Sequence, residues 1–252
     1  PEQDWKDIQI LINALERTSI KRFVLVSTVD VYPTPINVNE DSEIDKEKLH
    51  AYGLNRLRLE EWVKIHYKDY LIIRLPGLFG QNIMKNFIHD ILFPIPALFN
   101  ENFYSDLKNT MNEHDFQIIE RNYPKVGVNY TWNHKDEANV KNVLNQYKIS
   151  SLMFTDSQDI FQFYDLSQLK THIELCFENN IKIINLVSEP LSAFELYSFL
   201  FNRIFDNSLP RVKQFYDLRT KHASVFGGQK GYISTKQKMF IRIKRFIEAY
   251  KK

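Results

Sequence analysis

The sequence predicts an α/β protein with a doubly wound parallel sheet, and two observations support this prediction. Segments with helical spacing alternate with short apolar runs along the first eighty residues. The runs "KRFVLVST" at 21–28 and "YLIIRL" at 70–75 have the length and the continuous apolar character of strands buried on both faces. Ligands of such sheets bind at the carboxyl ends of the strands, so the polar ends of these two runs are the expected site.

Helical patterns precede both runs. Asp4 is expected to cap a first helix, because apolar residues follow it at spacings of three and four. A second helix is expected from about His50 to His66, after a loop that contains prolines and an acidic segment. The strand at 70–75 then stops at Pro76 and Gly77. Helix, strand, helix, strand at this pitch predicts parallel strands joined by right-handed crossovers, and the carboxyl ends of parallel strands lie at one edge of the sheet.

The pattern loosens beyond Ile83. A short helix within "NFIHDILFPIPALF" is expected to break at Pro94 and Pro96, and the polar stretch 100–150 shows a helical pattern only over 136–148. The remaining expected elements are a strand at 159–166, a helix capped by Ser167, a strand at 181–187, and helices over 192–204 and 235–250.

Composition narrows the class of protein. With 252 residues, 44% of them hydrophobic, the chain can bury a sizeable core. Its 33 basic and 31 acidic residues are too balanced to indicate nucleic acid or an anionic membrane as a partner. One cysteine and histidines without ligand spacing predict no metal site. Because we see no signal peptide and no membrane-spanning run, we expect a cytoplasmic protein.

Three motifs in register suggest chemistry. "STVDVYP" places Thr28 at a strand end, "YGLNR" places Tyr52 and Arg56 one helical turn apart, and "RLPGLFG" ends the next strand in a turn. Residues four apart share a helix face, so Tyr52 and Arg56 can reach one ligand. Each motif alone is weak: an isolated Tyr52 and Arg56 would usually be a packed aromatic beside a solvated cation. We also expect Arg74, at a buried strand end, to pair with an acidic residue.

These three motifs, in this order, resemble the extended short-chain dehydrogenase/reductase family, the NAD-dependent epimerase/dehydratase group that acts on nucleotide sugars. Thr28 with Val31 and Tyr32 is similar to the family's strand-end Ser/Thr, Tyr52 to Arg56 is similar to its Tyr-x-x-x-Lys, and "RLPGLFG" to its R-x-P-x-x-x-G. The resemblance implies a Rossmann-like fold. It divides the chain into 1–95, the carboxyl half of a nucleotide-binding domain, and 96–252, a smaller substrate-binding region with returning Rossmann elements at 159–187.

The resemblance also implies roles for individual residues. Tyr52 would be the acid/base, Thr28 its partner at the substrate oxygen, and Arg56 the cation that favours a phenolate. The residues implied to bind NAD or NADP are Ser27, Tyr52, Arg56, Pro76 and Leu78. Those implied to bind the substrate, expected to be a nucleotide sugar, are Asp30, Val31, Asn86 and Arg219. A homodimer is left open, and neither nucleic acid nor a membrane is an expected partner.

Two departures from the family pattern leave alternatives open. Arg56 replaces the lysine, and arginine keeps its charge and offers several donors but does not shuttle a proton. The glycine-rich turn that binds the dinucleotide pyrophosphate is missing, since Gly227, Gly228 and Gly231 lie near the carboxyl end. We therefore expect a fragment of a longer protein or a truncated product. The alternatives are a silent sugar-nucleotide-binding or regulatory protein, and a domain that needs a partner to supply the missing half and that exposes an apolar sheet edge.

Overall fold

The computed structural model describes residues 2–83 and 85–250, and it divides the chain into two compact units. The first unit comprises Pro1–Ile83, Gln158–Phe205 and Val212–Lys252, and the second comprises Met84–Ser157 and Asp206–Arg211. This division rests on packing and does not test the predicted functional boundary at 95/96, which stays a prediction. In the part of the chain that is described, no helix is long and apolar enough to cross a membrane.

A three-stranded parallel sheet organises the first unit. Its order is β1-β2-β9, and β2 lies between the other two strands. Ser27 of β1 is in register with Arg74 of β2, which in turn is in register with Asn185 of β9. The strands are β1 (Phe23–Thr28), β2 (Tyr70–Leu75) and β9 (Ile183–Asn185).

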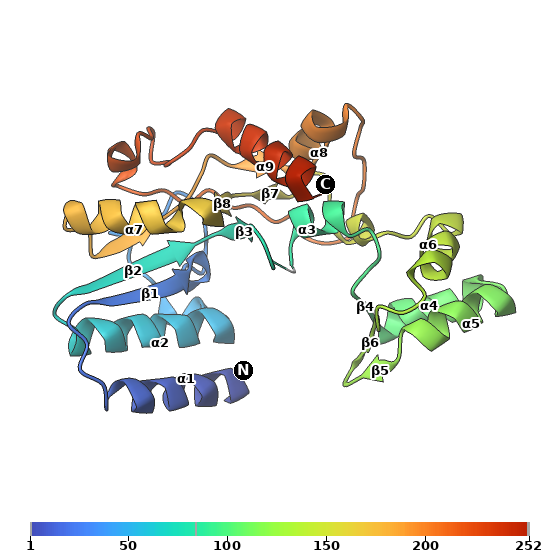
Figure 1. Cartoon of the computed structure of the whole chain (residues 1–252), viewed down its shortest axis with the longest axis horizontal. Helices are drawn as coiled ribbons and strands as arrows, with labels where there is room; N and C mark the ends of the chain where they lie inside the picture. The colour runs from blue at the N-terminus through green and yellow to red at the C-terminus, as the bar shows by residue number, and fades with distance from the viewer. Residues whose placement is uncertain (1, 84, 251–252) are drawn as a thin grey trace. The chain divides into compact units, whose positions relative to one another are not determined.

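Helices cover both faces of this sheet (Figure 1). α2 (Ala51–His66) packs on one face with α1 (Glu2–Leu15) against its outer side, and α7 (Leu169–Glu178) covers the other face. Side chains of β2 alternate between the two layers, because successive residues of a strand point to opposite faces. Ile72 packs with Val63 of α2, whereas Leu71 and Ile73 pack with Cys176 of α7. The predicted α/β fold with a parallel sheet is thereby confirmed, and the single cysteine, Cys176, is buried in the core.

The expected strand at 159–166 is wrong as a single element. It is divided at Gln162, whose buried side-chain amide donates to the carbonyls of Ser188 and Leu218 at 2.6 and 2.9 Å. On one side of Gln162, β7 pairs antiparallel with β10, and on the other side β8 pairs parallel with β3. The strands are β3 (Gly77–Phe79), β7 (Ile160–Phe161), β8 (Phe163–Asp165) and β10 (Leu191–Ser192).

Helix caps explain the remaining boundaries in the first unit. Asp165 caps the turn before α7, since its carboxylate accepts from the backbone nitrogen of Ser167; the predicted cap at Ser167 is wrong by two residues. Ser192 begins α8 (Ala193–Phe201) with a complete capping box to Glu195. α8 ends earlier than expected, because Asn202 adopts a left-handed conformation. α9 (Lys236–Tyr250) follows the predicted range and buries Phe240, Ile243 and Ile247.

The second unit is more regular than its polar sequence indicated. Its sheet has the order β4-β6-β5, and its helices pack around a core that contains Phe99, Ile119 and Tyr123. The predicted helix over 136–148 is confirmed as α6, but the two helices before it were not expected. The elements are α3 (Phe87–Leu92), β4 (Leu98–Asn100), α4 (Glu101–Thr110), α5 (Glu113–Asn122), β5 (Lys125–Val126), β6 (Asn129–Thr131) and α6 (Glu137–Gln146).

Candidate functional site

A cleft of about 330 Å³ lies where β1 and β2 end, at the edge where the sequence predicted a site. Its volume is at the low end of small-molecule pockets, which span about 300 to 1,000 Å³. The three motifs contribute to it together, although they come from different elements. The cleft is lined by Leu25, Val26, Ser27, Thr28, Tyr52, Arg56, Leu59, Leu75, Pro76 and Leu78.

Tyr52 and Arg56 lie on the first turns of α2 and face the same side, as their spacing predicted. The Arg56 guanidinium lies 4.8 Å from the centre of the Tyr52 ring, within the range of a cation–π contact. Tyr52 is 45% exposed and lines the cleft, so its side chain is accessible to a ligand. His50 fixes the start of the helix, because its Nδ1 accepts from the backbone nitrogen of Gly53 at 3.1 Å.

Gly53 is a site-forming residue that our sequence reasoning missed. A Cβ atom at this position would lie 2.2 Å from the carbonyl oxygen of Asp30, so only glycine lets α2 approach the loop after β1 so closely. That approach brings the start of α2 beside the end of β1. The signal was present in the sequence, because a glycine inside a helical pattern costs stability and usually has a packing reason.

Thr28 is the last residue of β1 and also caps the short 3-10 turn that follows. Its Oγ1 accepts from the backbone nitrogen of Asp30 at 3.1 Å. A hydroxyl group accepts and donates at once, so this contact fixes the orientation of Thr28 and leaves its proton available for another oxygen.

Asp4 is the second residue that sequence reasoning misjudged. α1 begins at Glu2, so Asp4 lies inside the helix and its carboxylate is not a cap. One carboxylate oxygen accepts from Arg56 at 2.7 Å and the other accepts from the Asn55 side chain at 2.8 Å. Asp4 therefore connects α1 to α2 and holds the guanidinium that faces Tyr52. Only tertiary structure brings residues 4 and 56 together, so the sequence carried no local signal for this contact.

A buried polar network includes Ser27, which is one of the residues that line the cleft. Arg74 donates to both carboxylate oxygens of Glu60, at 2.6 Å for the shortest contact, and Ser27 donates to the same carboxylate at 2.6 Å. Arg74 also donates to the Tyr32 oxygen at 2.6 Å, which receives a further bond from Asn185 at 3.0 Å. The expected acidic partner of Arg74 is thus confirmed as Glu60. The network connects α2 to all three strands of the sheet.

Burial and charge shift two pKa values within this network in the same direction. Burial raises the pKa of Tyr32 above 10, although the nearby Arg74 opposes the shift. Burial alone would lower the pKa of Arg74, but hydrogen bonds to Glu60 and the charge of its carboxylate raise it. Tyr32 therefore stays neutral and Arg74 stays charged, and Ser27 is committed to Glu60 within this network. Its predicted role in cofactor binding stays a prediction.

The four residues predicted to bind substrate occupy different environments. Asp30 is partly buried in the turn after β1, whereas Val31 is fully buried in a core cluster. Arg219 donates to Asp217, Asn37 and the carbonyl of Lys230, and it lies over the Tyr232 ring. Asn86 belongs to the second unit, where its side chain caps α3.

These environments limit how Arg219 and Val31 could bind a substrate. Arg219 holds loops together, so a phosphate would have to compete with its present partners. The side chain of Val31 is enclosed, which leaves only its backbone for a ligand. Among the described residues, no group of histidine, cysteine, aspartate and glutamate side chains could hold a metal ion.

Comparison with known proteins identifies the class of fold. No protein-family model matches the chain, and no curated protein matches it in sequence. Solved structures do match across nearly its whole length, and they have the Rossmann-like fold of the short-chain dehydrogenase/reductase superfamily. The resemblance predicted from the three motifs is therefore confirmed at the level of the fold.

Three structures illustrate the similarity, each at 14% identity. A short-chain dehydrogenase/reductase superfamily protein from Agrobacterium tumefaciens with bound NAD has a TM-score of 0.52 and covers 98% of this chain and 73% of its own. A UDP-glucuronic acid 4-epimerase from Bacillus cereus in complex with NAD has a TM-score of 0.54, with coverages of 96% and 66%. RMD from Pseudomonas aeruginosa complexed with NADPH has a TM-score of 0.54, with 95% and 71%.

Proposed function

We propose that the chain carries the catalytic cleft of an NAD(P)-dependent oxidoreductase, epimerase or dehydratase that acts on a nucleotide sugar or a related hydroxyl substrate. The observation that supports this most directly is the meeting of Thr28, Tyr52 and Arg56, taken from two separate motifs, in one cleft at the strand ends. The fold agrees with it. Structures of this fold include the Bacillus cereus epimerase in complex with UDP-glucuronic acid and NAD, at 13% identity.

In this proposal each of the three residues has one task. Oxidation of a hydroxyl group requires that its proton leaves, so Tyr52 accepts that proton and later returns it as the acid. Thr28 donates a hydrogen bond to the substrate oxygen and positions it in front of Tyr52. Arg56 contributes the positive charge of the site, and its guanidinium lies 4.8 Å from the centre of the Tyr52 ring. An arginine side chain does not shuttle a proton, so in this proposal the proton passes through Tyr52.

The cleft suits only one end of a dinucleotide cofactor. Pro76 and Leu78 provide an apolar wall for a flat ring, and Tyr52, Arg56 and Ser27 are the predicted polar contacts to the ring and its ribose. When bound, a nicotinamide ring would accept the hydride from the carbon that bears the substrate hydroxyl group. The sequence contains no G-x-G-x-x-G turn, so these residues alone offer no backbone site for the pyrophosphate.

Substrate binding and assembly complete the proposal. Asp30 lies in the turn directly after Thr28 and is the predicted substrate residue nearest to the cleft in sequence. The homodimer that the sequence left open is favoured by a groove of about 730 Å³ along α1 and α2, lined in part by Trp5, Ile10, Trp62 and Ile65. Ile10 and Ile65 are exposed, and a second copy of the same helices would cover them.

The experiment that tests this function measures cofactor reduction by the full chain. The chain is mixed with NAD⁺ or NADP⁺ and UDP-glucuronic acid, and absorbance at the reduced nicotinamide band is followed over time. Tyr52→Phe should reduce turnover by about 100-fold or more, because it removes the proton acceptor. Tyr250→Phe is the control, since this tyrosine on α9 is as exposed as Tyr52 but lies outside the cleft. Equal turnover in the two variants would refute the assignment.

A silent binding or regulatory protein is the second candidate. It is favoured by the Asp4 carboxylate, which already binds the Arg56 guanidinium in place of a ligand group. Calorimetric titration with UDP-glucuronic acid separates the two functions. Tight binding that Tyr52→Phe leaves unchanged, without reduction of either cofactor, would support the silent protein.

A further inference from the structure

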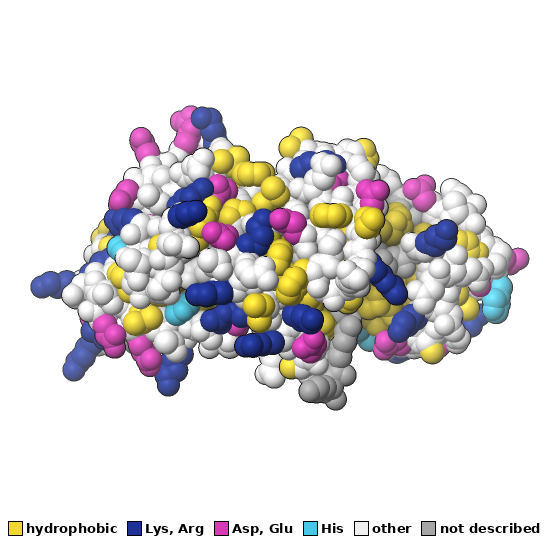
Figure 2. Space-filling model, turned by 90° about the horizontal axis from the view of Figure 1, so that it is seen from above, with side chains coloured by type: hydrophobic (Ala, Val, Ile, Leu, Met, Phe, Trp, Pro, Cys, Tyr) yellow, Lys and Arg dark blue, Asp and Glu magenta, His cyan; other side chains and the backbone are white. Residues whose placement is uncertain are grey.

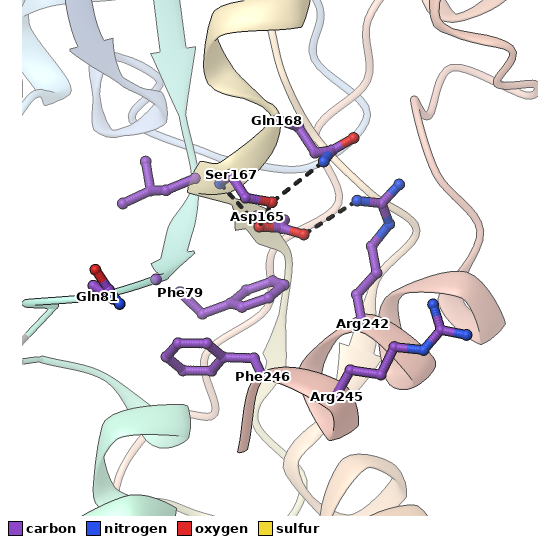
Figure 3. Close-up of a pocket in the computed structure, with 10 residues that line it drawn as sticks. Phe79, Gln81, Asp165, Ser167, Gln168, Arg242, Arg245 and Phe246 are labelled. Carbon is purple, nitrogen blue, oxygen red and sulfur yellow. Dashed lines mark hydrogen bonds and ion pairs between the residues drawn. The ribbon is translucent and has the colours of Figure 1, made fainter. Parts of the chain in front are cut away.

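A second and larger pocket lies in the first unit, and it shares no lining residue with the Tyr52 cleft. Its volume is about 810 Å³, which falls in the upper part of the range for small-molecule sites. It opens where β3 and β8 end, with Phe79 and Asp165 paired in register at its base, and α9 forms its other side (Figure 3). The proposed function leaves this pocket without a role.

The pocket contains more positive than negative side chains, because Arg242 and Arg245 line it together with one acidic residue. Asp165 is its single acidic residue, and one of its oxygens accepts from Arg242 at 3.1 Å. The other oxygen accepts from the backbone nitrogen and the hydroxyl group of Ser167, at 3.0 and 2.6 Å. Both carboxylate oxygens of Asp165 therefore already accept hydrogen bonds from other residues of the pocket. Arg245 is exposed one turn along α9, and no described residue forms a hydrogen bond or ion pair with it.

An apolar floor lies beside these charges. The rings of Phe79 and Phe246 are in contact, with their centres 5.6 Å apart and their planes tilted by 56° (Figure 3). Phe79 is buried, whereas Phe246 is only partly covered and remains accessible from the pocket. Figure 2 shows basic, acidic and apolar side chains interspersed on the face that it displays.

We propose that this pocket binds a small phosphate monoester that carries a flat apolar group. In this proposal Arg245 binds the phosphate, because a planar guanidinium can donate two parallel hydrogen bonds to two phosphate oxygens. The apolar group of the ligand packs against Phe246. A phosphate ester carries about −1.5 to −2 charge at neutral pH and presents three strong acceptor oxygens to the Arg245 guanidinium, one more than a carboxylate does. Arg242 stays on Asp165 and adds its charge at longer range.

Calorimetric titration of the full chain with phenyl phosphate tests the proposal. We expect saturable binding that Arg245→Gln weakens about tenfold, because the substitution removes a charge-assisted hydrogen bond. Lys238→Gln is the matched control: it removes the same charge from the same helix outside the pocket, and should leave the affinity unchanged. Both residues are exposed, so neither variant should lose its fold, which thermal unfolding checks.

Two further ligands separate the parts of the proposed site. Inorganic phosphate lacks the apolar group and benzyl alcohol lacks the charge, so each should bind at least tenfold more weakly than phenyl phosphate. Equal affinity for inorganic and phenyl phosphate would overturn the apolar half of the proposal. Equal losses in Arg245→Gln and Lys238→Gln would overturn the assignment to this pocket, as would a failure to saturate at about 10 mM, the weak end of ligand affinity. None of these results depends on turnover at Tyr52.

Discussion

Arg56 is the residue at which this chain departs from the short-chain dehydrogenase pattern that its motifs resemble. A guanidinium presents several donors in a plane, so one nitrogen can bind Asp4 while the group still lies near the Tyr52 ring. A lysine ammonium is a single point charge on a flexible stem, and binding Asp4 would draw it away from the tyrosine. The arginine and the aspartate are therefore best understood as one paired feature of the cleft.

A double-mutant cycle measures how strongly Asp4 holds Arg56. The Arg56 and Asp4 side chains are 27% and 31% exposed, so the pair should contribute about 1 kcal/mol to the free energy of unfolding. The cycle compares Asp4→Asn, Arg56→Gln and the double variant by urea denaturation. A coupling below about 0.3 kcal/mol would show that the contact does not position the guanidinium.

Glu60 and Arg74 should matter far more to stability than any surface ion pair. Both side chains are buried, so Glu60→Ala would leave the Arg74 charge without its partner, at a cost of about 3 to 5 kcal/mol in the free energy of unfolding. Replacing both residues with methionine should recover much of that loss, since no buried charge remains. Denaturant unfolding provides the measurement.

The exposed pair Arg22 and Asp69 is the control for this comparison. Their side chains are 56% and 42% exposed, so Asp69→Ala should cost less than about 1 kcal/mol. Similar losses for Glu60→Ala and Asp69→Ala would contradict the role assigned to the buried network.

At the scale of elements, the helices and strands that the sequence predicted are those with a long hydrophobic pattern and with packing partners close by in the sequence. The strand at 70–75 was clear because Leu71, Ile72 and Ile73 form an unbroken apolar run with both faces buried. The helices α4 and α5 of the second unit were missed, since each has ten residues and buries only a narrow stripe within a polar sequence. Short amphipathic helices carry too few periods to stand out from loops.

The residues of the candidate site follow the same rule: those with a local sequence pattern could be predicted, and those that depend on tertiary contacts could not. Tyr52 and Arg56 share a helix, so their spacing alone places them on one face. Thr28 required the further rule that parallel strands end at one edge. Asp4 and Gly53 depend on contacts that form only when α1 and the loop after β1 pack on α2, and no local pattern encodes those contacts.

α3 contains a pH-sensitive residue in the second unit. Burial raises the pKa of Asp90 to about 7. The folded protein then binds this proton more tightly than the unfolded chain, so the contribution of Asp90 is fully present below about pH 4 and is lost as pH rises toward 7. Asp90→Asn stays neutral throughout, and should be more stable than the unmodified chain at pH 8 by about 1 to 3 kcal/mol.

Urea denaturation at pH 4 and at pH 8 checks this expectation. At the lower pH the two proteins should unfold at nearly the same urea concentration, because Asp90 is protonated in the folded state. Asp106→Asn on the exposed side of α4 is the control, and it should change the stability little at either pH. An advantage of Asp90→Asn that is equal at both pH values would contradict the burial argument.

At the scale of the whole molecule, one edge of the main sheet is the surface through which we expect the chain to associate with itself. β1 pairs with β2 on one side, and no other described strand pairs with it. Phe23 donates its backbone proton toward β2, so the alternate residues Val24 and Val26 direct their backbone groups to the open side. Val26 is also 52% exposed. A parallel strand with an open apolar edge is a template for pairing with another chain.

Val26→Lys should therefore reduce self-association of the full chain, because a charge on an edge strand opposes the addition of a further strand. Static light scattering at rising protein concentration should show the variant remaining dispersed at several times the concentration at which the unmodified chain aggregates. Val128→Lys makes the same substitution at an exposed valine between β5 and β6, outside the main sheet, and should have little effect. If both variants disperse equally, the added charge is responsible and the β1 edge is not the surface that associates.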